Sequence, residues 1–213
     1  MDKIDIPFEI LRSKRRSIGL EVLSDTRLLV RANHRTPINQ IHDVITNNIK
    51  WIYKKQNFQK ERSIYQVIHT TYEEGDEFFY QGVKYPLNKF ILDPAKTRSI
   101  KRSLIKWYKG KAYHHIKERV SAFQDIMGVQ HNSIKITSAK TRWGSCSRGG
   151  RLNFTYRLIM LPQGAIDYII VHELAHLKVM NHSARFWKIV LEFMPDYKER
   201  RRWIRKNSYL FEL

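Results

Sequence analysis

The 213-residue chain contains a single cysteine, Cys146, and no apolar stretch as long as a membrane span. One cysteine excludes an internal disulfide bond and is typical of a protein in a reducing cytosol. Because a spanning helix needs about 20 consecutive apolar residues, we expect no membrane partner. The first residues include Asp2, Asp5 and Glu9 and lack the apolar centre of a secretory signal peptide. The sequence therefore predicts a cytoplasmic protein.

Acidic residues are also scarce, because 20 Asp and Glu face 39 Lys and Arg, for a formal net charge of +19. Such an excess favours a polyanionic partner: nucleic acid, a nucleotide or an acidic protein. The alternative is a solvated, self-repelling surface, and net charge alone does not decide between them. No DNA-reading motif is present. Hydrophobic residues make up 42% of the chain, enough for a core, which excludes a wholly disordered protein.

Hydrophobic periodicity and turn residues predict an α+β fold. Short strands are expected at 4–11, 18–23, 27–32, 133–138 and 151–158, and a hairpin over 77–91 that turns at Gln81-Gly82. Helices are expected from Pro37, from Ser99 to about Met127, from Pro162, from Ser183 and from Pro195. The pattern divides the chain into a strand-rich region, 1–95, with one basic amphipathic helix, and a helical region, 96–213. We expect the two regions to form one integrated domain.

The segment Val171–Leu177 carries an HExxH pattern made of His172, Glu173 and His176. Residues four apart lie on the same face of a helix, so both imidazoles can bind one ion. Glu173 then points near the ion without ligating it. Apolar neighbours make this a buried helix, where three ionisable groups are costly unless something satisfies them. The pattern indicates a metal site, and imidazole ligands suit one Zn²⁺.

A catalytic zinc ion needs a third protein ligand. His182 lies six residues after His176, and a turn at Asn181 can bring it back towards the metal. Glu192 and Glu199, on the following helices, are rival ligands. We favour His182 and leave the glutamates open.

The chain resembles the YgjP-like metallopeptidase family, which is related to SprT-like and WLM-type zinc proteases. The resemblance lies in RWGSC (142–146), RLNFTYRL (151–158), HELAHL (172–177) and NHSARFW (181–187), in this order and spacing. It implies a zincin-like metallopeptidase domain packed against the strand-rich region. It also implies zinc ligands His172, His176 and His182, and Glu173 as the catalytic base.

These residues predict a zinc-dependent peptidase that acts on a protein or peptide. Zinc acidifies its bound water and polarises the scissile carbonyl, while Glu173 takes the proton of the attacking water. Arg142 and Tyr156 are our candidates for contacts with the substrate. The strand 151–158 is expected to offer its edge to an extended peptide. No histidine partner is evident near Cys146, so we expect a small half-buried thiol and not a nucleophile.

Two other functions fit parts of the pattern. YgjP-like proteins have been linked to UTP pyrophosphatase activity, so the resemblance also admits a metal-dependent nucleotide pyrophosphatase on the same HExxH site. The resemblance to SprT-like proteases and the basic surface admit a nucleic-acid-associated protease or binding module. The latter depends on charge alone.

Overall fold

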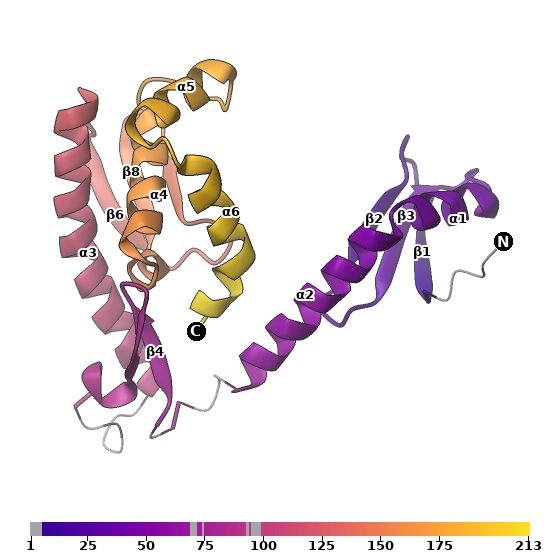
Figure 1. Cartoon of the computed structure of the whole chain (residues 1–213), viewed down its shortest axis with the longest axis horizontal. Coiled ribbons are helices and arrows are strands. Elements are labelled where there is room, and N and C mark those ends of the chain that lie inside the picture. Colours follow the sequence, from indigo (N-terminus) through magenta and orange to yellow (C-terminus); the bar gives the residue numbers. More distant parts are fainter. Residues whose placement is uncertain (1–5, 69–71, 74, 93, 95–98) are drawn as a thin grey trace. The chain divides into compact units, whose positions relative to one another are not determined.

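The computed structural model describes residues 6–68, 72–73, 75–92, 94 and 99–213, with only the backbone described over 64–68. The first residues of the predicted strand 4–11 lie outside this range. The chain divides into two compact units, Met1–Thr70 and Thr71–Leu213 (Figure 1). Helices and strands are both present in each unit, which confirms the α+β class. No described helix is both long enough and apolar enough to cross a bilayer.

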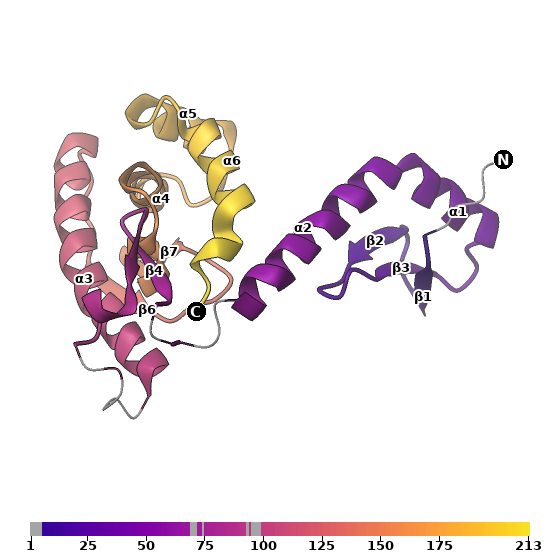
Figure 2. The ribbon, with the colours of Figure 1, turned by 60° about the horizontal axis from the view of Figure 1, so that its bottom comes forward.

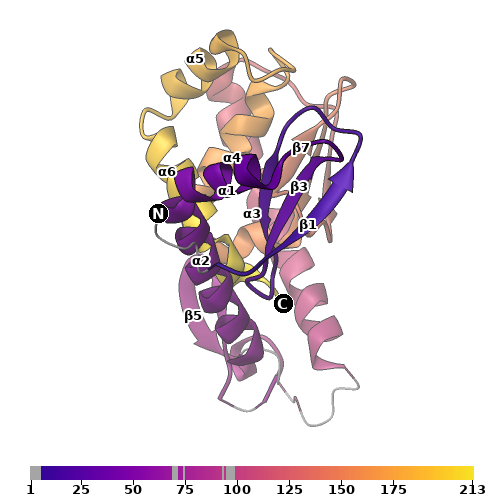
Figure 3. The ribbon, with the colours of Figure 1, turned by 90° about the vertical axis from the view of Figure 1, so that its right-hand side faces the viewer.

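The first unit is a three-stranded sheet with two helices on one of its faces (Figures 2 and 3). Its elements are β1 (Phe8–Ser13), β2 (Gly19–Val22), β3 (Leu28–Asn33), α1 (Ile38–Asn47) and α2 (Ile49–Ile68). The central strand, β3, is parallel to β1 and antiparallel to β2. One continuous helix was expected after Pro37, but Asn48 leaves helical geometry (φ −113°, ψ 13°) and separates α1 from α2.

Alternation along β3 explains the core of this unit. Leu28, Val30 and Ala32 are fully buried, as expected for every second residue of a strand that has one face covered. Isoleucines of the helices complete this core: Ile41, Ile45 and Ile52.

The second unit begins with the predicted hairpin, β4 (Glu77–Tyr80) and β5 (Val83–Pro86). Gln81 and Gly82 both have positive φ (50° and 82°), the geometry of a two-residue hairpin turn. The N–H groups of these two residues donate to the carbonyls of Ile159 and Met160. The hairpin tip is therefore bound to the segment that leads into the HExxH helix.

The region boundary expected near residue 95 differs from this division. Phe78, Leu87 and Phe90 belong to the same hydrophobic core as the helices of the second unit. Residues from Thr71 onward therefore group with the helical region, because Phe78 of the hairpin, Leu87 of η1 (Leu87–Lys89) and Phe90 are buried there.

A 28-residue helix, α3 (Ile100–Met127), precedes the second sheet of this unit. Ser99 is its N-cap, and Gly128 ends it in the left-handed conformation (φ 59°), as the sequence predicts. The sheet consists of β6 (Ser133–Thr137), β7 (Gly144–Cys146) and β8 (Arg151–Thr155), in the order β6-β8-β7. β6 is parallel and β7 antiparallel to β8.

This strand order corrects one expectation, that residues 151–158 offer a free edge. β8 is the central strand, so both its edges are paired, and its last predicted residues form instead a 3₁₀ turn, η2 (Tyr156–Met160). The edge strand beside the HExxH helix is β7.

The remaining elements are α4 (Gln163–Ala175), α5 (Ala184–Phe193), α6 (Tyr197–Asn207) and η3 (Ser208–Phe211). The HExxH helix, α4, is buried on nearly all sides and packs against both α3 and α6 (Figures 1 and 2). Burial all round explains why α4 is predominantly apolar apart from the residues of the motif.

Candidate metal centre

The three predicted histidine ligands converge at the end of α4. His172 and His176 lie one turn apart on this helix, with ring centroids 5.0 Å apart. After Ala175 the chain leaves the helix and turns, so that the ring of His182 lies 4.7 Å from that of His176. One nitrogen of each ring lies within 4.8 Å of the others. No other group of three potential ligand side chains was found among the described residues.

The distances suit a small cation. The Nε2 atoms of His172 and His182 are 3.0 Å apart. Two nitrogens bound to a tetrahedral zinc ion at about 2.0–2.1 Å are separated by roughly 3.3 Å, so a small rotation of the rings accommodates the ion. The Nδ1 atom of His172 is buried and has no hydrogen-bond partner within the described ranges. The nitrogen of His172 that faces His182, and so would meet a bound cation, is Nε2.

The rings are held by packing and by one backbone hydrogen bond. Nδ1 of His176 lies 3.1 Å from the carbonyl oxygen of Val179, which as an acceptor requires the proton on Nδ1 and leaves Nε2 free to ligate. The fully buried Phe186 stacks on His176, with ring centroids 4.5 Å apart. Trp187 stacks on His182 at 5.7 Å. Both aromatic residues come from α5, so this helix positions the site from the side opposite α4.

Burial keeps the α4 histidines neutral, which is the state that binds metals. It lowers the pKa of His172 to about 3, with further lowering by His176, His182 and Arg201. The pKa of His176 is also lowered, again chiefly by burial.

Glu173 lies beside the histidines and is only 5% exposed. Burial raises the pKa of its carboxyl to about 8, while the nearby positive charge of Arg142 acts in the opposite direction. The carboxylate packs directly over Gly144 of β7, where a β-carbon would lie 2.6 Å from Oε1. Position 144 therefore has room only for glycine as long as Glu173 keeps this rotamer.

Two cavities flank the histidines. One, of about 310 Å³, contains both His172 and Glu173 in its lining. The rest of that lining comes from β7 with the residue before it, α4, α6 and η3: Trp143, Gly144, Tyr168, Ile169, Arg201, Ile204, Arg205 and Ser208. It combines apolar side chains with two guanidinium groups.

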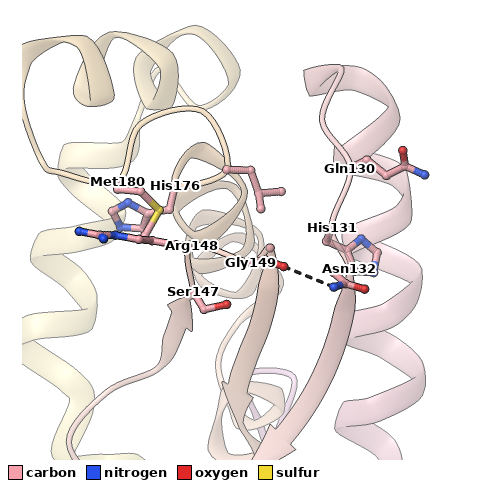
Figure 4. A pocket seen from close by; sticks show the side chains of 10 residues that line it. Gln130, His131, Asn132, Ser147, Arg148, Gly149, His176 and Met180 are labelled. Carbon is pink, nitrogen blue, oxygen red and sulfur yellow. Dashed lines mark hydrogen bonds between the residues drawn. The ribbon is translucent and has the colours of Figure 1, made fainter.

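The other cavity, of about 640 Å³, opens beside His176 (Figure 4). Its lining comes from the segment before β6, the β7–β8 loop and the turn after α4: Gln130, His131, Asn132, Ser147, Arg148, Gly149, Gly150, Leu177 and Met180. Arg148 and Met180 lie next to His176, and a hydrogen bond from the Asn132 side chain to the Gly149 carbonyl joins the two sides. The candidate metal centre therefore lies between two cavities, as a site in a substrate cleft would.

The structure separates the other predicted site residues. Arg142 is exposed next to β7 and acts electrostatically on Glu173. Tyr156 is buried in the core, stacked on Tyr108, and is absent from the lining of both cavities. Glu192 and Glu199, the rival ligands, are exposed and do not belong to the histidine cluster.

Sequence reasoning did not place Gly144, Tyr168 or the arginines of α6 at this site. The glycine of RWGSC was a readable signal, because a glycine inside a strand often marks the close approach of another group. Arg201 and Arg205 are four residues apart, a spacing that places them on one face of a helix.

The known proteins to which this chain is similar are described as metallopeptidases. A family model described as "YgjP-like, metallopeptidase domain" matches residues 16–90 and 88–207. The chain is 28% identical to the metallopeptidase zymogen abylysin of Pyrococcus abyssi over 43% of this chain and 93% of that one, with a TM-score of 0.39. It is 22% identical to the zymogen jannalysin of Methanocaldococcus jannaschii over 44% and 96%, with a TM-score of 0.40. No curated protein matches.

Proposed function

The chain belongs to the YgjP-like metallopeptidase family, a family of metal-dependent hydrolases, and from this premise we propose that it cleaves peptide bonds at the His172–His176–His182 centre. One zinc ion is the proposed metal, and Glu173 is the proposed general base. The observation that carries this proposal is the convergence of three imidazole nitrogens beside a buried carboxylate.

When bound, zinc would supply a Lewis acid that acidifies water and polarises the scissile carbonyl. The protein's own contribution is to position the metal ligands and the general base. His172, His176 and His182 leave a fourth tetrahedral position for water or substrate. Glu173 accepts the proton of the attacking water and then donates it to the leaving amine nitrogen. Its carboxylate cannot move towards β7, because Gly144 already contacts it.

The edge of β7 supports a peptide as the substrate. Thr155 donates to the Trp143 carbonyl and Ser147 donates to the Arg151 carbonyl, so the residues on either side of β7 bond to β8. The register leaves the N–H and C=O groups of Gly144 and Cys146 directed away from β8. An extended peptide can add to this edge by main-chain hydrogen bonds, which places its scissile bond beside Glu173.

The nucleotide and nucleic-acid alternatives have no comparable support. The family model and the two solved structures are described as metallopeptidases, and none of these descriptions names a nucleotide or a nucleic acid. The positive charge that suggested a polyanion is also compatible with an acidic peptide.

The test combines metal content with peptide cleavage. Purified wild type is expected to contain one zinc ion per chain and to cleave a mixture of fluorogenic peptides. Glu173→Gln should retain zinc and lose activity by about 10²–10⁴-fold. His176→Ala should lose both, while His114→Ala, which replaces an exposed histidine of α3, should lose neither. Pyrophosphate release from UTP without peptide cleavage, or a metal-free wild type, would overturn the proposal.

A further inference from the structure

The cavity beside Glu173 carries two positive charges that the proposed hydrolysis does not use. Arg201 and Arg205 lie one turn apart on α6 and both line this cavity. None of the ion pairs found among the described residues involves either of them. By contrast, Arg200 of the same helix is bound to Asp196 and to the Gly164 carbonyl. The helix therefore directs one arginine into a structural contact and two into the cavity.

Arg201 makes a cation–π contact with Trp187. Its guanidinium carbon lies 5.0 Å from the centroid of the Trp187 ring. Trp187 in turn stacks on His182 at 5.7 Å and on Tyr197 at 5.2 Å. When a guanidinium lies over an aromatic ring, the N–H groups at its edge remain free to bind a carboxylate. The indole ring of Trp187 thus contacts both the guanidinium group of Arg201 and the proposed metal ligand His182.

The other walls of the cavity strengthen an ionic contact. Trp143, Ile169 and Ile204 contribute apolar surface, next to which an ionic contact is screened less than in bulk water. Glu173 is the one carboxylate in the lining, and it lies at the end of the cavity next to His172. A volume of about 310 Å³ is enough for one side chain or for a chain terminus, and too small for a folded segment.

We propose that this cavity is a specificity subsite that binds a carboxylate of the peptide, an acidic side chain next to the scissile bond or a free C-terminus, through Arg205 and Arg201. This inference rests on the proposed peptidase function, because a peptide on the edge of β7 passes Trp143 and Gly144 and so reaches the cavity. Both arginines are exposed, and Arg201 lies over the Trp187 ring, so Arg201 forms the fixed wall while Arg205 sets the preference.

The experiment uses amidated fluorogenic octapeptides in which a single Asp is moved through three positions on each side of the cleaved bond, each paired with an Asn counterpart. At one position adjacent to that bond, wild type should prefer Asp by about tenfold in kcat/KM. Arg205→Glu should abolish this preference. Arg202→Glu is the matched control, since Arg202 is exposed on α6 and does not line the cavity.

A second arm repeats the series with free C-termini. Faster cleavage of the free-acid Asn peptides than of their amidated counterparts assigns the subsite to the terminal carboxylate, and a preference for Asp in the amidated series assigns it to an acidic side chain. Equal cleavage of all Asp and Asn peptides in both series, or a preference unchanged in Arg205→Glu, would overturn the inference.

Binding separates this inference from the proposed function. The anisotropy of labelled Asp and Asn peptides is measured with Glu173→Gln, alone and combined with Arg205→Glu. If wild type cleaves no peptide, but Glu173→Gln binds the Asp peptide selectively and loses this selectivity with Arg205→Glu, the subsite is supported and the peptidase function is rejected. If wild type cleaves peptides without any charge preference, the peptidase function is supported and the subsite is rejected.

Discussion

Gly144 and Glu173 are in direct contact, although 29 positions separate them in the sequence. A β-carbon at residue 144 would lie 2.6 Å from Oε1 and 2.7 Å from Cγ of Glu173. This contact joins the edge strand, β7, to the HExxH helix. Two motifs that carry the family resemblance, RWGSC and HELAH, are therefore in contact. The glycine of the first provides the surface on which the Glu173 carboxylate of the second packs.

Gly144→Ala should displace this carboxylate without removing a metal ligand. We expect kcat for peptide cleavage to fall by about 10²-fold or more, since an active-site displacement of about 1 Å has effects of that order. Zinc content should remain that of wild type. Gly110→Ala, on α3, is the control, because no atom lies within 4 Å of an added β-carbon there. Unchanged activity in Gly144→Ala would show that Glu173 does not depend on this contact.

Metal removal should lower the thermal stability of the second unit. A ligand present at a thousand times its dissociation constant stabilises the folded state by about 4 kcal/mol, which corresponds to a shift in Tm of roughly 8–16 °C for a domain of this size. Differential scanning calorimetry with and without a chelator measures the shift. His182→Ala should abolish it, while Glu192→Ala should leave it unchanged. The reverse result would assign the third ligand to the glutamate.

The candidate metal site was predictable because its key spacing is local. His172, Glu173 and His176 need only a helix to bring them together, and periodicity predicts that helix. The third ligand stayed open between His182 and two glutamates, because it depends on the turn after Ala175 and on the packing of α5. Those contacts involve Phe186 and Trp187, and the sequence around these residues does not predict which way their rings point.

The sheet arrangement was not predictable in the same way. Residues 151–155 form a strand, as the alternation of Leu152 and Phe154 indicates, but whether a strand is central or at an edge depends on its partners. β6 pairs in parallel with β8 only because the chain crosses over between them, leaving β7 outside. The break between α1 and α2 at Asn48 could not be predicted either, because the periodic spacing of isoleucines continues across it. The position of Arg201 and Arg205 in the cavity could not be predicted either, because it depends on how α6 packs on α4.

Phe186→Ala should weaken both the fold and the metal site. The side chain is fully buried and its ring lies within 4.9 Å of all three histidine rings, by centroids. Truncation of a buried phenylalanine costs about 3–5 kcal/mol of unfolding free energy. Zinc affinity, measured by competition with a chromophoric chelator, should also fall. Val190→Ala is the comparison: Val190 is equally buried on α5, so it should cost stability and leave the affinity unchanged. Equal effects on affinity would deny Phe186 a positioning role.

Cys146 should react slowly with alkylating reagents. Burial, with a smaller contribution from Glu173, raises the pKa of its thiol from 9.0 to about 11. The reactive thiolate is therefore about a hundredfold rarer at pH 8 than in the unfolded chain. Because the folded pKa is raised, this group contributes stability that is complete below pH 9 and is lost as the pH rises towards 11. Mass spectrometry after iodoacetamide treatment at pH 8, in buffer and in guanidinium chloride, compares the two states. Equally fast labelling in both would reinstate Cys146 as a candidate nucleophile.

The last prediction concerns the ion pair that holds α4 against α3. Arg119 donates two hydrogen bonds to the carboxylate of Asp167, at 2.8 and 3.0 Å, and the side chain of Gln163 donates a third at 2.8 Å. Asp167 is 9% exposed, so removal of the arginine leaves a nearly buried carboxylate with one donor. We expect Arg119→Ala to lower the unfolding free energy by about 1.5–3 kcal/mol in urea titrations, since that is the scale of hydrogen bonds to charged groups.

Two further variants decide how this pair acts. Lys117→Ala removes an exposed charge from the same helix and should change the unfolding free energy by less than about 0.5 kcal/mol. The double variant Arg119→Met, Asp167→Leu should recover much of the loss, because replacing both partners leaves no buried charge without a donor. If the double variant is as unstable as Arg119→Ala, the loss comes from packing along α3 and not from an uncompensated Asp167. In that case the ion pair does not explain why the HExxH helix tolerates an acidic residue on its buried face.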